Sequence, residues 1–172
     1  MTTARANAPM RVVVLVSGRG SNLKAIEARA VAGELPIRIV AVVSDRADAG
    51  ALPWARERGI ETAVLSHRDF PDRDTYSRAL ADLVEGYAPQ LVVLAGFMRI
   101  LGEDFVNRFA GRLFNIHPSL LPRYPGLHTH RRALAAGDRE HGASVHFVTP
   151  ELDGGPVVIQ ARVPVLPGDD EE

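Results

Sequence analysis

Short runs of aliphatic and β-branched residues recur along the first half of the chain, separated by segments whose apolar residues have helical spacing. A continuous apolar run is typical of a strand that is buried on both faces, as in a parallel sheet. The pattern therefore predicts strands at residues 11–16, 37–43, 62–65 and 91–96.

The segments between these strands carry start and stop signals of helices. Residues 21–33 place apolar side chains on one face, with Ser21 as a candidate N-cap and Gly33 as a stop. Asp72 can cap a longer helix over residues 72–87. A shorter helix is expected at residues 53–58, and Tyr76, Leu80, Leu83 and Val84 form the inner face of the longer one.

The pattern changes after residue 96. A helix at residues 103–110 precedes the stretch RLFNIHP, and a proline-rich crossing leads to another helix near residues 129–136. Two further strands, at 143–149 and 156–165, are joined by the hairpin-like turn PELDGG. This order predicts a single α/β domain with a Rossmann-like, doubly wound sheet, which is mostly parallel with an antiparallel C-terminal addition.

Composition narrows the classes of function. The 172 residues suffice for one well-buried domain, and a net charge of -1 does not favour the many phosphate contacts of nucleic-acid binding. The chain has no cysteine, which excludes disulfides, zinc–thiolate sites and cysteine nucleophiles. It has no apolar run for a membrane span, and residues 1–10 lack the apolar core of a signal peptide. We therefore expect a mobile leader at residues 1–10, a domain at 11–172, a cytoplasmic location, and neither nucleic-acid nor membrane partners.

The loop LVSGRGSNL joins the first expected strand to the first helix. Gly18 and Gly20 allow a tight turn, after which the N–H groups of Gly20, Ser21 and Asn22 can face an anion at the helix N-terminus. Leu23 stands where a dinucleotide-binding loop has its third glycine, and the lysine of a P-loop is missing. The loop therefore predicts a site for a single phosphate; the alternative is a tight turn that binds nothing.

The stretch FNIHPSLLPRYPG places two polar side chains at the end of an apolar strand. Asn115 and His117 are two residues apart, so in an extended segment both point to the same side. An amide, or a protonated histidine, can stabilise an oxygen that becomes negative, and a histidine can also carry a proton. With no serine or cysteine arranged as a nucleophile, the pair suits direct transfer between two substrates through a tetrahedral intermediate.

A carboxylate is expected to orient and charge His117. Asp153, in the turn ELDGGP, is the candidate, and Glu151 is its nearby competitor. The simpler alternative is that Asn115 caps a turn and that His117 is a satisfied core histidine.

The remaining histidines raise the question of a metal. Their spacings fit no standard zinc signature, and no nearby carboxylate completes a ligand set. We therefore expect no metal at His128, His130, His141 or His146.

Four stretches carry a family resemblance: SGRGSNL, LAGFMRIL, FNIHPSLLPRYPGLHTHRRAL and HGASVHFVTPELDGGPVVIQ. In this order they closely resemble the glycinamide ribonucleotide (phosphoribosylglycinamide) formyltransferases, a folate-dependent family of purine biosynthesis, over nearly the whole chain from Arg11. The resemblance implies the formyltransferase fold. It also implies that 10-formyltetrahydrofolate, as a co-substrate, gives its formyl group to the glycinamide amine on the way to IMP. The partners are then small molecules, and we expect a monomer or weak homodimer.

The resemblance also implies roles for individual residues. The catalytic trio corresponds to Asn115, His117 and Asp153, and residues 149–153 correspond to the loop that closes over the folate. A phosphate-binding half is expected at about residues 11–96, and a folate and catalytic half at about 97–172. The matched phosphate-binding residues are Gly20, Ser21 and Asn22, and the matched folate-binding residues are Arg73, Met98, Arg99, Ile100, Leu101 and Asn115.

Three alternatives remain. A formyltetrahydrofolate deformylase would share the Asn–His–Asp chemistry but use water as the acceptor. A methionyl-tRNA formyltransferase would be longer and would carry a basic RNA-binding domain. A nucleotide-binding module without catalysis would explain the glycine loop but not the three polar residues together. Members of the family continue past VLPGDDEE with a segment that packs on the domain and contacts substrate; without it, we expect lower stability and weaker ribonucleotide binding.

Overall fold

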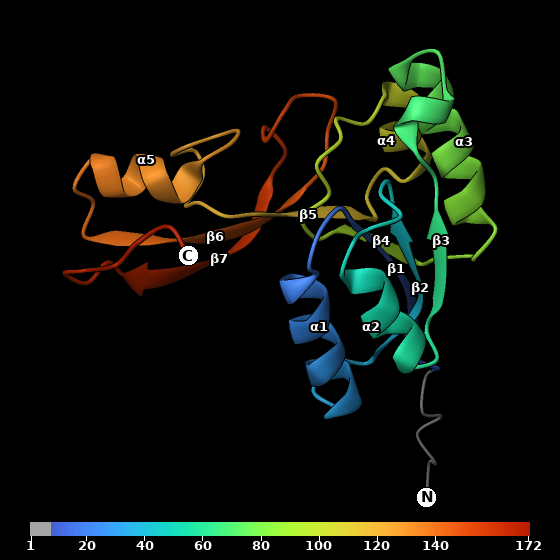
Figure 1. Ribbon diagram of the computed structural model, residues 1–172, viewed down its shortest axis with the longest axis horizontal. Helices are drawn as coiled ribbons and strands as arrows, with labels where there is room; N and C mark the ends of the chain where they lie inside the picture. The colour runs from blue at the N-terminus through green and yellow to red at the C-terminus, as the bar shows by residue number, and fades with distance from the viewer. Residues whose placement is uncertain (1–7) are drawn as a thin grey trace, which may run out of the picture.

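In the computed structural model, residues 8–172 form a seven-stranded sheet flanked by helices (Figure 1). The strand order is β3-β2-β1-β4-β5-β6-β7; the first five strands in this order are parallel, and β6 and β7 are antiparallel additions. The strands are β1 Met10–Val16, β2 Ile37–Ser44, β3 Glu61–Val64, β4 Leu91–Leu94, β5 Leu113–His117, β6 Glu140–Phe147 and β7 Val157–Pro164. The helices are α1 Ser21–Val31, α2 Ala51–Glu57, α3 Arg73–Glu85, α4 Glu103–Arg108 and α5 Thr129–Ala135, with a 3₁₀ turn, η1, at His67–Asp69.

The central strand β1 shows why helices cover both faces of the sheet. Because successive side chains of a strand point to opposite faces, Val13 and Leu15 enter a core with α3 and α4. The alternate residues Val12 and Val14 enter a second core with α1 and α2. A strand that is apolar at every position therefore requires a helical layer on each side.

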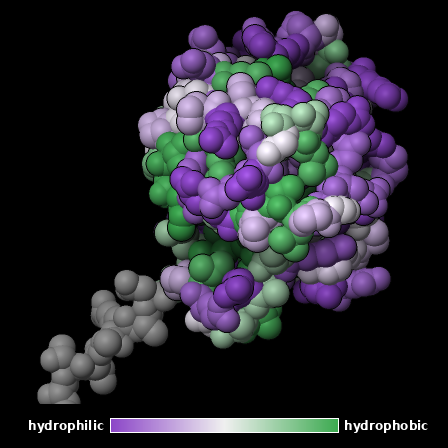
Figure 2. Space-filling model, turned by 90° about the vertical axis from the view of Figure 1, so that its left-hand side faces the viewer, coloured by the Kyte–Doolittle hydropathy of each residue, from purple (hydrophilic) through white to green (hydrophobic). Residues whose placement is uncertain are grey.

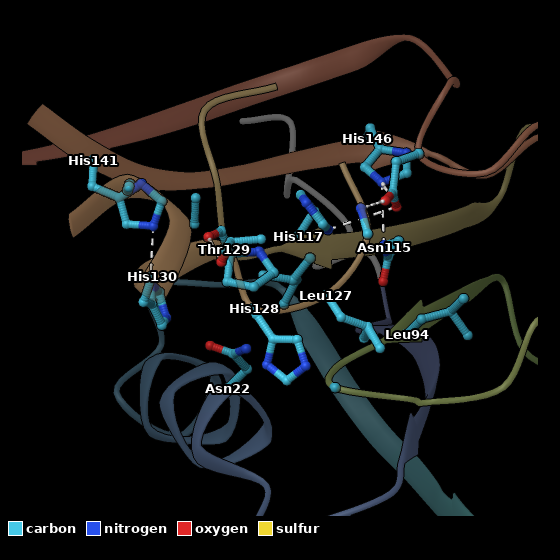
Figure 3. A pocket seen from close by; sticks show the side chains of 18 of the residues that line it. Asn22, Leu94, Asn115, His117, Leu127, His128, Thr129, His130, His141 and His146 are labelled. Carbon is cyan, nitrogen blue, oxygen red and sulfur yellow. Dashed lines mark hydrogen bonds and ion pairs between the residues drawn. The ribbon is translucent and has the colours of Figure 1, made fainter. Parts of the chain in front are cut away.

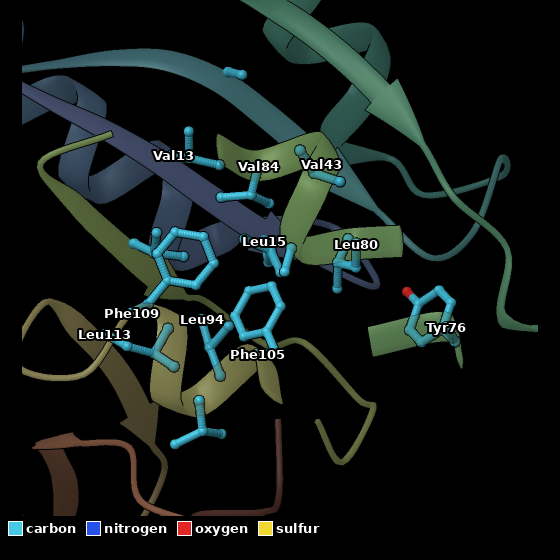
Figure 4. Close-up of a cluster of buried hydrophobic side chains, with 14 residues drawn as sticks. Val13, Leu15, Val43, Tyr76, Leu80, Val84, Leu94, Phe105, Phe109 and Leu113 are labelled. Carbon is cyan, nitrogen blue, oxygen red and sulfur yellow. The ribbon is translucent and has the colours of Figure 1, made fainter. Parts of the chain in front are cut away.

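The first of these cores contains the aromatic side chains of α4 and its end (Figure 4). The rings of Phe105 and Phe109 are fully buried, with centroids 4.8 Å apart. Beside them, Leu80 of α3 and Leu94 of β4 fill the same layer. This packing fixes the end of β4, from which one wall of the functional site continues.

The predicted fold class is confirmed, and so is the cap of the longest helix. The Asp72 carboxylate accepts a hydrogen bond from the Thr75 N–H at 2.7 Å. The predicted inner face of α3 also holds, since Tyr76, Leu80 and Val84 are buried and Leu83 packs against the same core.

Several local predictions are wrong. Ser21 does not cap α1: Gly20 holds the N-cap position in a left-handed conformation, and no side chain caps the helix. Met10, which we assigned to the leader, is the first residue of β1 and pairs with Ile37. The leader prediction for residues 1–7 lies outside the described residues. The strand expected at 143–149 begins earlier, at Glu140, because its first residues pair with the far end of β7.

The outermost strand, β7, carries exposed apolar side chains. Val157, Val158, Ile159 and Val163 are each between 45% and 64% exposed. Figure 2 looks onto the end of the molecule that α5, β6 and β7 form, and it shows hydrophobic side chains interspersed with hydrophilic ones. The antiparallel addition therefore extends beyond the two helix-covered cores.

Candidate functional site

A cavity of about 1120 Å³ lies where the parallel part of the sheet meets the antiparallel addition (Figure 3). Its wall includes the end of β5, the start of α1, residues 96–101, residues 126–130 and the turn at 149–153. The chain leaves β1 toward β2 and returns to β4 on the other side of β1. Such a reversal of strand order opens a crevice at the carboxyl ends of the strands.

Asn115 lies directly opposite His146 in the β5–β6 ladder, and the two side chains are in contact. His146 Nδ1 is 2.9 Å from the Phe147 carbonyl oxygen, which can only accept, so Nδ1 carries the hydrogen. The neutral ring then offers its Nε2 lone pair to the Nδ2 amide group of Asn115 at 3.2 Å. This bond fixes the orientation of the amide and leaves its second N–H for a ligand in the cavity.

His146 is a residue of the site that our sequence reasoning considered only as a metal ligand. It is almost fully buried, at 2% exposure, and lies 31 residues from Asn115 in the chain. The register of β5 against β6 was the signal that could have paired them.

His117 ends β5 and is held between two acceptors. Its Nε2 donates to the carbonyl oxygen of Tyr124 at 2.9 Å, in the proline-rich crossing. Its Nδ1 faces Asp153, with the Oδ1 atom at 3.6 Å. Since the carbonyl occupies the Nε2 hydrogen, Nδ1 is the ring nitrogen that faces the carboxylate.

Asp153 is brought to His117 by the turn between β6 and β7. Its Oδ2 accepts from the Gly126 N–H at 2.8 Å, and its Oδ1 is also 3.9 Å from His146 Nε2. The carboxylate side chain is only 7% exposed, whereas the competing candidate Glu151 is exposed. The two groups of the expected pair therefore lie close together, at a distance longer than a direct hydrogen bond, and they form an ion pair when His117 is protonated.

The turn that carries Asp153 depends on close backbone approach. The Phe147 N–H donates to the Pro156 carbonyl at 3.0 Å and closes the hairpin. A Cβ atom on Gly155 would lie 1.7 Å from the Phe147 carbonyl oxygen, so this position admits only glycine. Asp153 itself has a φ of 51°, a left-handed conformation that few residues other than glycine adopt and that aspartate tolerates better than most.

The N-terminus of α1 forms one end of the cavity. Ser21 and Asn22 line it, and their N–H groups lie in the first turn, ahead of the Lys24 N–H that bonds to the Gly20 carbonyl. Asn22 and His128 lie on the same side of the cavity in Figure 3. Unpaired N–H groups and the helix dipole make this end suited to an anion.

Gly20 shapes this end without lining the cavity. Its φ is 74°, and a Cβ atom there would lie 2.7 Å from the Cβ of Ala51 at the start of α2. Any side chain at Gly20 would therefore disturb the fold at this end of the cavity.

The segment after β4 forms another wall of the cavity. Met98 and Ile100 expose 66% and 60% of their surface, and they line the cavity together with Arg99 and Leu101. Apolar side chains that are held open in a cavity suit a flat aromatic ligand.

Arg73 does not line this cavity. It lies on a smaller adjoining one, of about 460 Å³, which shares Met98, Arg99 and Ile100 with the first. Within residues 8–172, the buried Tyr76 hydroxyl of this smaller cavity has no hydrogen-bond partner, and burial raises the pKa of Tyr76.

A pair of histidines lines the cavity away from Asn115 and His117. His141 Nε2 and His130 Nδ1 are 2.9 Å apart, so a single hydrogen joins them. Burial and the neighbouring His130 lower the pKa of His141. Among the residues that the structure describes, no group of three or more His, Asp or Glu side chains is arranged to hold a metal.

Comparison with known proteins gives a consistent result. Residues 10–172 match the family described as formyl transferase. The phosphoribosylglycinamide formyltransferase of Escherichia coli (strain K12) is 57% identical over 163 residues, which are 95% of this chain and 77% of the relative. The solved structure of the phosphoribosylglycinamide formyltransferase of Coxiella burnetii is 51% identical, with a TM-score of 0.88 over 94% of this chain and 76% of that one. Glycinamide ribonucleotide transformylase 1 of Symbiobacterium toebii is 43% identical, with a TM-score of 0.91 over 95% of this chain and 77% of that one.

Proposed function

The chain belongs to the formyl transferase family, and from this premise we propose that it transfers the formyl group of 10-formyltetrahydrofolate to the amine of 5-phosphoribosylglycinamide in IMP biosynthesis. The observation that carries the proposal is the meeting of Asn115, His117 and Asp153 in one cavity. That cavity has an anion-binding helix end at one side and an open apolar segment at another. It therefore offers separate places for a phosphorylated acceptor and an aromatic donor.

Each substrate has residues suited to its chemistry. The ribonucleotide phosphate is placed at Ser21 and Asn22, where N–H groups and the helix dipole favour an anion. In this proposal the pterin of the folate lies against Met98 to Leu101, which line the cavity, and the turn that carries Asp153 closes over it. We assign Arg73, which lines the adjoining cavity, to a further contact with the folate.

The reaction is a direct transfer. The acceptor amine forms a bond to the formyl carbon, and the carbonyl electron pair moves to the oxygen. The free N–H of Asn115 donates to this oxyanion, while protonated His117, held beside Asp153, adds positive charge near it. When the intermediate collapses, an electron pair of the oxyanion re-forms the C=O bond and the bond from carbon to the folate nitrogen breaks. That nitrogen takes the electron pair of the broken bond and gains a proton, and the amine gives one up. The proton passes through water.

A product assay separates this reaction from its alternatives. The chain is incubated with 10-formyltetrahydrofolate, with and without 5-phosphoribosylglycinamide, and products are identified by mass spectrometry. We expect formylated ribonucleotide and tetrahydrofolate only when both substrates are present. Formate release without the ribonucleotide would identify a deformylase, and absence of turnover would identify a binding module.

Introducing a negative charge at the helix end is expected to impair acceptor binding selectively. In Asn22→Asp, a carboxylate in the first helical turn agrees with the helix dipole, so the fold is retained, but it repels the phosphate. We expect the KM for 5-phosphoribosylglycinamide to rise by about tenfold or more, since about 1.4 kcal/mol of repulsion suffices. The KM for 10-formyltetrahydrofolate should change by less than about twofold on the same scale.

The matched control for this experiment is Asn107→Asp on the exposed face of α4, away from the cavity. It should behave as the parent protein. An equal rise of both KM values in Asn22→Asp would contradict a phosphate site at this helix end.

Broader properties follow from the same proposal. We expect small-molecule substrates only, no resident metal, a monomer or weak homodimer, and a cytoplasmic location. The phosphate-binding half at about residues 11–96 and the folate and catalytic half at about 97–172 then meet at the cavity. No helix among residues 8–172 combines the length and apolarity needed to cross a membrane.

A further inference from the structure

Asp45 is a buried carboxylate that the proposed chemistry does not use. It follows the last residue of β2, and its side chain has no exposed surface. An isolated carboxylate in such a place is strongly unfavourable unless it is paired and hydrogen-bonded. The partners of Asp45 therefore indicate why the chain keeps a charge there.

Both oxygens of Asp45 have a partner from another strand end. Oδ1 accepts from the Ser17 hydroxyl at 2.6 Å, just beyond β1. Oδ2 accepts from the Arg99 Nε–H at 2.8 Å, in the segment after β4. Because β2, β1 and β4 are adjacent in the sheet, their carboxyl ends bring these three residues together.

Ser17 extends the network to the backbone of the same segment. Its hydroxyl oxygen accepts from the Met98 N–H at 2.8 Å, and its own N–H donates to the Gly96 carbonyl at 3.1 Å. Residues 96–99 are thus tied to the sheet by two backbone groups and one guanidinium. These bonds continue the attachment that the Ala95 N–H makes to the Leu15 carbonyl at 2.9 Å, and they help to fix the direction of the chain after β4.

The anchored segment presents its side chains to the cavity. Met98 and Ile100 are largely exposed there, although both are apolar. Arg99 uses Nε for Asp45, its side chain is 37% exposed, and it borders both cavities. Its terminal guanidinium N–H groups are therefore available to a ligand, an arrangement that lysine cannot reproduce.

We propose that Asp45 and Ser17 are positioning residues, which hold residues 96–99 in the conformation that binds 10-formyltetrahydrofolate. The inference rests on the proposed function, because it assigns this segment to the folate. Asp45 acts through Arg99 and Ser17, and it contributes to folate affinity without touching the reacting atoms.

The variant Asp45→Asn tests this role. The amide still accepts from Ser17, but the charge that holds Arg99 is lost. Loss of a charge-assisted hydrogen bond predicts about a tenfold or larger rise in the KM for 10-formyltetrahydrofolate. The same rise is expected in the Kd for tetrahydrofolate, measured by isothermal titration calorimetry. The kcat and the KM for 5-phosphoribosylglycinamide should stay within about twofold, because the remaining site is unchanged.

Asp48→Asn is the matched control. Asp48 lies in the same loop and pairs with Arg46 at 2.9 Å, but both side chains are more than half exposed. An exposed pair contributes little, so this variant should keep the parent values. A loss of folate affinity in Asp48→Asn equal to that in Asp45→Asn would overturn the proposal. The loss would then follow from any change of charge in the loop, and not from the bond between Asp45 and Arg99.

Two further variants keep the test decisive if Asp45→Asn does not fold. Arg99→Gln changes a partly exposed side chain and should weaken tetrahydrofolate binding. Ser17→Ala should do so by releasing the Met98 N–H. An unchanged Kd in Arg99→Gln, or an equal rise of both KM values in Asp45→Asn, overturns the proposal.

A double variant tests whether Asp45 acts through Arg99. The double variant Asp45→Asn/Arg99→Gln should bind tetrahydrofolate no more weakly than whichever single variant binds it more weakly. The reason is that each single variant already breaks the Asp45–Arg99 pair. Fully additive losses would overturn the proposed pathway. Calorimetry needs no turnover, so a parent protein that binds tetrahydrofolate but forms no formylated ribonucleotide would contradict the proposed function alone.

Discussion

Asn115→Ala is expected to lower kcat by about a hundredfold to a thousandfold, the usual scale for losing one donor to an oxyanion. The amide has one N–H bonded to His146 and lines the cavity, where we propose that its second N–H donates to the oxyanion. Alanine removes the donor to the developing charge, while both substrates keep their own binding residues. The loss should therefore appear in kcat, with smaller changes in both KM values, in steady-state kinetics that vary each substrate in turn.

The fold should survive this substitution. Losing the bond to His146 costs about 1 kcal/mol, which corresponds to roughly 2–4 °C in melting temperature for a chain of this size. Asn107→Ala, on the exposed face of α4, is the control and should keep full activity. If Asn115→Ala unfolds or loses many degrees of melting temperature while any folded fraction retains its kcat, the amide is a structural cap.

We expect His146 to affect the reaction by orienting the Asn115 amide. Its Nε2 accepts only while the ring is neutral, because the Phe147 carbonyl holds the hydrogen on Nδ1. The hydrogen bonds of this strand pair thus orient the amide that we propose as the donor to the oxyanion.

The fold was predictable because the hydrophobic pattern is simple. Strands β1, β2 and β4 are apolar along almost their whole length, which a parallel sheet covered on both faces requires. The Asp72 cap could be predicted because Asp72 and the N–H that it binds are only three positions apart in the chain. In both cases, patterns among residues that are close in the sequence were enough for the prediction.

At several positions where tertiary contacts decide, the sequence reasoning failed. Ser21 is a good N-cap by propensity, yet the turn requires a left-handed residue that fits against Ala51, and only Gly20 does. The partners of Asp45 lie 28 and 54 residues away, and no periodicity connects them. Asn115 and His117 could be paired by their spacing, because extended backbone puts alternate residues on one side. The partner of Asn115, His146, depends on the β5–β6 register, and the Tyr124 carbonyl that His117 binds depends on the proline-rich crossing. The spacing of residues in the sequence reveals neither.

Asp153→Asn is expected to lower kcat by about a hundredfold or more while keeping the turn closed. The amide oxygen can still accept from the Gly126 N–H, which Asp153 Oδ2 now does at 2.8 Å. What disappears is the negative charge 3.6 Å from His117 Nδ1. An imidazolium at His117 would then be buried beside a neutral amide and would be less available to stabilise the oxyanion.

Two roles of Asp153 can be separated, because it contacts both His117 and the loop at Gly126. If Asp153 acts through His117, then the double variant His117→Ala/Asp153→Asn should be no slower than His117→Ala alone. Glu151→Gln, an exposed change in the same turn, should keep kcat and both KM values. Fully additive losses in the double variant, with a KM for 10-formyltetrahydrofolate that rises in Asp153→Asn, would show that the carboxylate serves closure over the folate. In that case Asp153 would hold the loop at Gly126, and His117 would stabilise the transition state without a charged partner.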